Sequence, residues 1–191
     1  RAVQDERERI HSDLHDDVGA KLLSLVYRAG SPEAADLARS ALQDLRDVVS
    51  RVGSGSFQLE DVLADIRAEC EQRLSGASIA LEWHQTEGIA PIELTQPHAL
   101  NLGRIVRETI SNAIRHAQAS AVTVHITPDG EGLHIEICDN GIGGAVDGHV
   151  PGRGLRNMQA RAQLIGAQLE RFSVLPQGCG VRLTIPSFTG T

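Results

Sequence analysis

Aromatic side chains are scarce in this chain of 191 residues, which has three phenylalanines, one tryptophan and one tyrosine. Proteins that bind single-stranded nucleic acid stack the bases on aromatic side chains, so that class of protein is disfavoured. The sequence also lacks a dense basic run, and its formal net charge is -7 at pH 7. An acidic chain of this kind is a poor candidate for direct binding to DNA or RNA. We therefore expect no nucleic-acid partner.

Cysteines and long apolar runs are also few. Cys70, Cys138 and Cys179 are far apart and lack the spacing of a metal site, which is typical of a reducing, cytosolic setting. No apolar run approaches the ~20 residues that span a bilayer, and no signal peptide is recognisable. We expect a cytoplasmic protein with no membrane segment in this stretch. Because the chain starts inside a helical pattern, we interpret it as a fragment, and a membrane anchor in a missing N-terminal part is compatible with this.

Two amphipathic helices are predicted in residues 1–52. The first, over about 5–28, has apolar residues at steps of three and four: Ile10, Leu14, Val18, Leu22 and Leu25. The second repeats this spacing from Leu37 to Val52. A lone hairpin cannot bury both apolar stripes, so we expect two copies to pair as a four-helix bundle. The alternative is that the hairpin packs on the rest of its own chain. A linker of glycine and serine follows at 53–56.

Residues 57–188 mix helical and strand patterns. The spacing of apolar residues predicts helices over about 58–74, 96–116 and 154–165. Alternation predicts strands over about 79–83, 122–127, 133–138, 167–174 and 180–185. Asp129-Gly130 marks the turn between two of these strands. Mixed strands with helices on one side predict an α+β fold, a two-layer α/β sandwich.

The helix predicted over 96–116 carries a polar column. Glu108 and Asn112 lie four residues apart and share one face, while Arg115 and His116 lie one turn further on. A carboxylate and an amide oxygen suit Mg²⁺, which binds few protein groups and takes phosphate oxygens as further ligands. Arg115 and His116 can meet phosphate oxygens. Taken alone, the column is equally compatible with an ordinary polar helix face.

Two glycine-rich loops follow. The first is Asp139-Asn140-Gly141-Ile142-Gly143-Gly144, in which a carboxylate at a strand end can accept a hydrogen bond from an adenine amino group. The second is Gly152-Arg153-Gly154-Leu155, which opens a helix whose free N–H groups can face phosphates. Each loop alone is also compatible with a plain turn. The ordered set of motifs, completed by Gly178-Cys179-Gly180 before the last strand, is far more specific than any single motif.

His15 is the candidate nucleophile of the first helix. It lies one residue off the apolar face, so its imidazole flanks the buried stripe. A neutral imidazole is a good nucleophile, and Asp16 can accept a hydrogen bond from one ring nitrogen and leave the other free to attack. On this stretch alone, a surface histidine on an acidic helix is the simpler interpretation. The motifs downstream reverse that preference.

In this order the motifs resemble the ATP-binding domain of the GHKL superfamily, which includes gyrase, MutL and the sensor histidine kinases. The upstream segment Arg7-x-Arg9-Ile10-x-x-x-Leu14-His15-Asp16 is similar to the phosphoacceptor helix of the NarX/DesK-type histidine kinases. The resemblance covers nearly the whole chain. It implies a dimerisation and phosphoacceptor domain at 1–52 and a catalytic domain with the Bergerat ATPase fold at 57–188.

The resemblance also implies a role for each matching residue. His15 would accept the γ-phosphoryl group of ATP with Asp16 as acid/base partner, and Glu108 and Asn112 would hold Mg²⁺. Asp139 would read the adenine amino group. The other implied nucleotide contacts are Arg115 and His116 at the phosphates, Gly141 and Gly143 in the adenine pocket, and Gly152, Gly154 and Leu155 at the end of a mobile lid over 144–153. The implied partners are a second copy of the chain and the receiver domain of a response regulator.

Two positions depart from the family pattern. Ala20 stands where these kinases usually have Gln or Asn to orient a water, so we expect weak phosphatase activity toward the regulator. Cys179 stands where the last glycine motif usually has Thr beside the adenine site. The main alternative function is a GHKL-type ATPase or serine protein kinase that does not use His15.

Overall fold

The computed structural model describes residues 56–87, 89, 91–143, 153–186 and 188, together with Ser24, Gly30, Ser31, Ala34, Ala35 and Ala38. The chain divides into two compact units, Arg1–Ser54 and Gly55–Thr191. His15, Asp16, Ala20 and Gly152, which the sequence singles out, lie outside the described residues. The fold and the site described below belong to the second unit.

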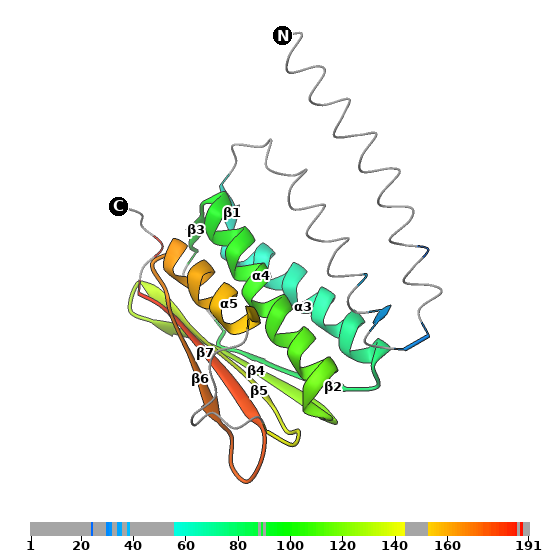
Figure 1. Ribbon diagram of the computed structural model, residues 1–191. Coiled ribbons are helices and arrows are strands. Elements are labelled where there is room, and N and C mark those ends of the chain that lie inside the picture. Colours follow the sequence, from blue (N-terminus) through cyan, green and yellow to red (C-terminus); the bar gives the residue numbers. More distant parts are fainter. Residues whose placement is uncertain are drawn as a thin grey trace. The chain divides into compact units, whose positions relative to one another are not determined.

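A five-stranded mixed sheet and three α-helices form the two layers of this unit (Figure 1). The sheet order is β2-β4-β5-β7-β6, with β2 parallel to β4 and the other pairs antiparallel. The strands are β2 (Ala80–Gln85), β4 (Ala121–Asp129), β5 (Gly132–Asp139), β6 (Gln168–Ser173) and β7 (Cys179–Ile185). The helices α3 (Leu59–Gly76), α4 (Gln96–Asn112) and α5 (Arg153–Leu164) lie against one face of the sheet, with α4 in the middle. The predicted two-layer α/β sandwich is therefore confirmed.

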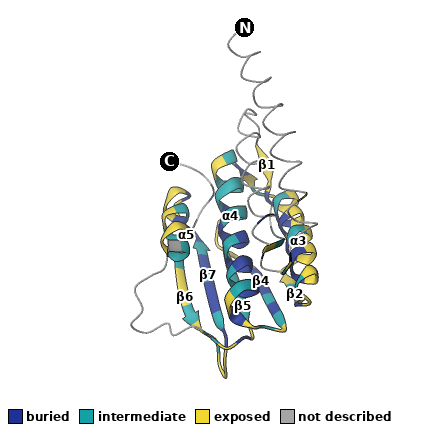
Figure 2. Cartoon of the chain, turned by 45° about the vertical axis from the view of Figure 1, so that its right-hand side comes forward, coloured by how far each residue is buried: buried dark blue, intermediate teal, exposed yellow. Residues whose placement is uncertain are grey.

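Alternation along the strands builds the core between the two layers (Figure 2). On β4 and β5, every second residue is buried and faces the helices: Val122, Val124, Ile126, Leu133, Ile135 and Ile137. Leu102, Ile105 and Ile110 of α4 are buried against them, each at most 1% exposed. Burying each such side chain contributes about 1.5–3 kcal/mol, so these positions fix how α4 sits on the sheet.

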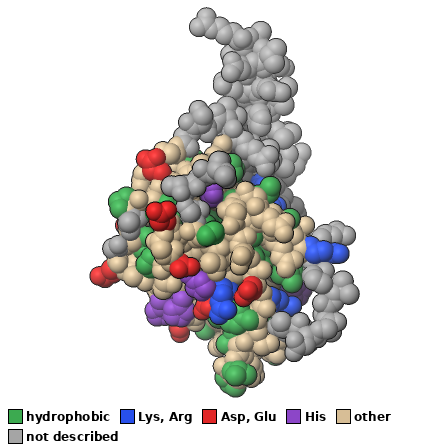
Figure 3. All heavy atoms as spheres, turned by 90° about the vertical axis from the view of Figure 1, so that its left-hand side faces the viewer, with side chains coloured by type: hydrophobic (Ala, Val, Ile, Leu, Met, Phe, Trp, Pro, Cys, Tyr) green, Lys and Arg blue, Asp and Glu red, His purple; other side chains and the backbone are tan. Residues whose placement is uncertain are grey.

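The opposite face of the sheet is polar. One row runs across all five strands through residues paired in register: His84, His125, Glu136, Arg182 and Glu170. Figure 3 shows histidine side chains gathered beside acidic and basic ones on one side of the molecule. Arg182 Nε donates to Glu136 Oε1 at 2.6 Å. Burial acts to raise the pKa of the Glu136 carboxyl, but hydrogen bonds from Arg182 and His134 outweigh it and hold that pKa below its ordinary value.

The structure corrects the predicted elements at two places. The helix predicted over 96–116 ends as an α-helix at Asn112 and continues as a π-helix, η2 (Ala113–Ala117). The wider turn places the Ala117 carbonyl oxygen 2.8 Å from the Ile142 amide, which donates a hydrogen bond to it. Two short strands, β1 (Phe57–Gln58) and β3 (Glu93–Leu94), form a separate antiparallel pair that the sequence pattern did not predict. Two residues are too few to show an alternating pattern.

Candidate nucleotide site

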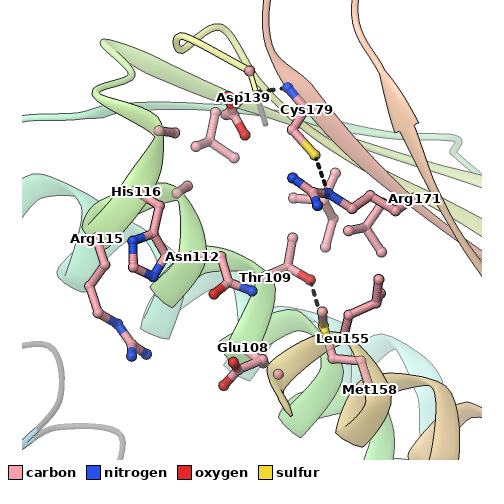
Figure 4. A pocket seen from close by; sticks show the side chains of 17 residues that line it. Glu108, Thr109, Asn112, Arg115, His116, Asp139, Leu155, Met158, Arg171 and Cys179 are labelled. Atoms are coloured by element: carbon pink, nitrogen blue, oxygen red, sulfur yellow. Dashed lines mark hydrogen bonds between the residues drawn. The ribbon is translucent and has the colours of Figure 1, made fainter. Parts of the chain in front are cut away.

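A cavity of about 490 Å³ opens between α4, α5 and the sheet (Figure 4). Seven elements contribute to its wall, and several of the contributing residues are far apart in the sequence. Its polar and charged lining residues are Glu108, Thr109, Asn112, Arg115, His116, Asp139, Arg171 and Cys179. Its apolar lining includes Val122, Ile137, Leu155, Met158 and Val181. An apolar cavity with a few convergent polar groups has the character of a small-molecule site.

Glu108 and Asn112 line the cavity from one side of α4. They are four residues apart, so they occupy successive turns of one helix face. Asn112 is the last residue of α4, immediately before the π-helix that carries Arg115 and His116. Single π-helical turns inside α-helices recur at functional sites. All four residues of the predicted polar column therefore line one cavity. Glu108 and Asn112 lie on α4, whereas Arg115 and His116 lie on the π-helix η2.

Asp139 at the end of β5 is held by two backbone amides. Its Oδ1 accepts hydrogen bonds from Gly141 N at 2.9 Å and from Cys179 N at 3.3 Å. Gly178, with φ of 127°, passes so close that a β-carbon there would overlap the Asp139 carbonyl oxygen. These contacts fix Oδ1 and leave the second carboxylate oxygen to accept a bond from a ligand. Thr is not needed at position 179 for this contact, because the backbone of Cys179 makes it.

The predicted glycines fall into two groups. Gly143 and Gly154 line the cavity, and a β-carbon on Gly154 would overlap the Oε1 atom of Glu108. Gly141 lies beside the cavity without lining it, and a β-carbon there would overlap the Ala117 carbonyl oxygen. Its role is to let the end of β5 approach the end of η2. The neighbouring Asn140 is also structural, since its Oδ1 accepts bonds from Ser120 N and Ala121 N at 2.9 and 3.0 Å.

Comparison with known proteins agrees with this geometry. Residues 98–189 match the family of histidine kinase-, DNA gyrase B- and HSP90-like ATPases. The chain is 30% identical to sensor histidine kinase YxjM of Bacillus subtilis, over 98% of the chain and 49% of that protein. It is 29% identical to sensor histidine kinase LiaS of the same organism, over 97% of the chain and 55% of that protein. Residues 98–189 are therefore assigned to a GHKL-type ATPase domain, and the chain as a whole is similar to sensor histidine kinases.

The fold of the chain agrees with solved structures. The histidine kinase domain of the blue-light activated kinase EL346 from Erythrobacter litoralis matches with a TM-score of 0.63 and 19% identity, over 90% of this chain and 95% of that one. The chain spans about half the length of the curated relatives it matches. No helix in the described part of the chain is long and apolar enough to cross a membrane.

The lining of the cavity includes polar groups that suit a nucleotide, and two of them suit a magnesium ion. The family match implies ATP binding. The described residues contain no group of three or more His, Cys, Asp or Glu side chains arranged to hold a metal. Glu108 and Asn112 nevertheless supply the hard oxygen donors that Mg²⁺ prefers, and this ion usually completes its coordination with phosphates and water. A metal at this site would therefore depend on the nucleotide that carries it.

The sequence pattern did not single out Arg171, and it marked Cys179 only as a departure from the Thr that the family usually has beside the adenine site. Arg171 lies on β6, and its Nε donates to Cys179 Sγ at 2.9 Å inside the cavity wall. A signal was present in the alternation of the strand, because Leu169 packs against the core and Arg171 lies two residues further on the same face. A charged residue at an inward position of a strand indicates a site.

Proposed function

We propose that the chain is the transmitter core of a two-component sensor histidine kinase, of the NarX/DesK type that its phosphoacceptor segment resembles. In this proposal residues 57–188 bind Mg-ATP and residues 1–52 form a dimeric phosphoacceptor hairpin. The γ-phosphoryl group passes to His15 and then to an aspartate of a response regulator. The observation that carries the proposal is the convergence of Glu108, Asn112 and Asp139 on one cavity, in a chain of this family.

Each end of the cavity has a part in binding the nucleotide. The free oxygen of Asp139 accepts a hydrogen bond from the adenine amino group, while apolar residues such as Ile137 and Val181 cover the faces of the base. Arg115 and His116 contact the phosphates. Glu108 and Asn112 would hold Mg²⁺, which would neutralise charge on the phosphate oxygens during transfer. Binding along the whole nucleotide positions the γ-phosphorus for an external nucleophile.

The phosphoryl step forms one bond and breaks one. A ring nitrogen of His15 attacks the γ-phosphorus, and the bond from that phosphorus to the oxygen bridging to the β-phosphate breaks. Asp16 accepts the proton of the imidazole, so that the product is a phosphohistidine and ADP. The receiver aspartate later attacks the same phosphorus and releases His15.

The test is the chemical nature of the phosphate bond formed with radiolabelled ATP. The full chain should acquire label that is lost in acid and retained in alkali, as expected of phosphohistidine. His15→Gln should lose the label and still bind ADP, whereas His11→Gln, one turn earlier, serves as the matched control and should keep it. Chelation of Mg²⁺ should also abolish labelling.

The competing functions give different outcomes. A serine kinase would leave acid-stable label on a protein, and a plain GHKL ATPase would release phosphate without labelling the chain. Label that persists on His15→Gln would exclude His15 as the acceptor.

A further inference from the structure

We propose that Arg171 reads the purine base of the bound nucleotide, by donating a hydrogen bond to N1 of adenine beside the bond that Asp139 accepts from the 6-amino group. This inference rests on the proposed nucleotide site and names a second determinant of its specificity for adenine. It assigns a role to a side chain that no motif of the sequence singled out.

Arg171 lies on β6 and lines the cavity. Its guanidinium extends from β6 toward the cavity and lies next to Cys179, on the side of the cavity that Asp139 also lines (Figure 4). In the sheet, Arg171 is paired in register with Val181, another lining residue. β6 is the edge strand of the sheet, so this arginine forms the outer wall of the cavity.

The second step is how Cys179 connects the two polar groups. Its backbone N–H donates to Asp139 Oδ1 at 3.3 Å, and its Sγ accepts from Arg171 Nε at 2.9 Å. One residue thus holds a carboxylate on one side and a guanidinium on the other. Because the bond to sulfur uses Nε, the two terminal nitrogens of the guanidinium still have N–H groups to donate.

The third step is the charge of Arg171. Among the residues that the structure describes, no carboxylate lies within ion-pair distance of this guanidinium. By contrast, Arg182 on the neighbouring strand pairs with Glu136 and stacks over Phe172 on the other face of the sheet. The two arginines of this hairpin therefore differ: one has protein partners for its charge, and the other faces the cavity.

The fourth step is the pattern of donors and acceptors. Adenine presents a donor at its 6-amino group and an acceptor at N1, which match the acceptor Asp139 and the donor Arg171. Guanine presents an acceptor at O6 and a donor at N1. The acceptor Asp139 would then face an acceptor, and the donor Arg171 would face a donor. A site built to bond a polar edge rejects analogues that leave its groups unpaired.

The test is a double-mutant cycle in which one change is made in the protein and the other in the base. The measured quantity is the affinity of the full chain for nucleoside diphosphates, determined by calorimetry. We expect wild-type protein to bind 1-deaza-ADP, which lacks N1, about tenfold more weakly than ADP. The matched nucleotide 7-deaza-ADP, which keeps N1, should bind like ADP. Arg171→Met, which keeps the length of the stem, should bind ADP about tenfold more weakly and show no further loss with 1-deaza-ADP.

Controls separate this inference from the proposed function. Arg67→Met removes an exposed arginine that pairs with Glu71 on α3, and should leave all affinities unchanged. If Arg171→Met still binds 1-deaza-ADP more weakly than ADP, the inference is overturned. It is also overturned if the variant loses affinity for ADP and for GDP by the same factor, because Arg171 would then contact the phosphates or stack on the base. Absence of any ADP binding would overturn both, whereas labelling of His15 tests the proposed function alone.

Discussion

Two neighbouring columns of α4 show how one helix serves structure and chemistry. Arg107 and Ser111 face α3, and Glu108 and Asn112, each one residue further on, face the cavity. The first column is buried and bonded. Arg107 Nε donates to Glu69 Oε1 at 2.8 Å, and Ser111 Oγ accepts from Arg73 Nη2 at 2.5 Å.

The second column has a different environment. The acceptors of Glu108 and Asn112 lie open to the cavity, where a nucleotide or its metal can reach them. Buried polar groups in proteins are almost always paired, so the α3-facing column fixes the rotation of α4 about its own axis. With α4 rotated in this way, Glu108 and Asn112 face the cavity. The polar side chains of the α3-facing column therefore position the site without lining the cavity.

The largest expected effect is on the α3-facing column. Glu69→Ala leaves Arg73 and Arg107, only 2% and 6% exposed, without their shared carboxylate. Removing one partner of a buried ion pair costs about 3–5 kcal/mol, so thermal unfolding followed by circular dichroism should shift strongly downward. Glu71→Ala is the matched control, because the exposed pair it breaks with Arg67 is worth at most about 1 kcal/mol. Equal shifts in both variants would contradict the role of the α3-facing column.

The next effect is on ligand affinity with the fold retained. Asp139→Asn can still accept the amides of Gly141 and Cys179 with its remaining oxygen, so stability should change little. Its NH₂ group then faces the adenine amino group, donor against donor, and the charge is lost. We expect affinity for ADP to fall about 100-fold by calorimetry. An unchanged affinity would remove Asp139 from the adenine site.

Much of this architecture could be predicted because local patterns and tertiary burial agree. The alternation of β4 and β5 and the start of α4 at Gln96 follow from side-chain periodicity and from Pro97 in the first turn. The π-helical turn could not be predicted, since Ala113–Ala117 continues an ordinary helical pattern and its winding matches a tertiary bond to Ile142. The alternation of β6 places Arg171 on the same face as Leu169, but the groups that Arg171 meets there depend on the sheet order β5-β7-β6, which is long-range information.

Gly154 and Gly141 form a matched pair that separates an effect on the ligand site from an effect on the fold. In Gly154→Ala the new methyl group meets the end of the flexible Glu108 side chain, which can move aside. We expect nearly unchanged stability and a roughly tenfold slower autophosphorylation, because Glu108 is displaced from its place at the proposed metal. In Gly141→Ala the methyl group meets the backbone of Ala117, which cannot move freely, so thermal stability should fall. A Gly154→Ala protein that is destabilised as much as Gly141→Ala would show that both glycines are structural.

The smallest effect concerns Cys70, which packs beside the buried charges of the α3-facing column and is 3% exposed. Burial, and next the charge of Glu69, raise the pKa of its thiol from 9.0 to about 12, while Arg73 and Arg107 act in the opposite direction. Between these two pKa values the native thiol keeps a proton that the unfolded chain has lost. Stability therefore falls as pH rises above about 9.

Cys70→Ala lacks this titration, so its stability deficit relative to wild type should shrink between pH 8 and pH 10. The expected change is about 1 kcal/mol in denaturant unfolding, since a full pKa unit is worth about 1.4 kcal/mol. The variant costs stability at pH 8 because it removes a packed sulfur. A deficit that stays constant over this range would mean that the thiol ionises in the native state as easily as in the unfolded chain. The charges next to it would then be more hydrated than their burial indicates.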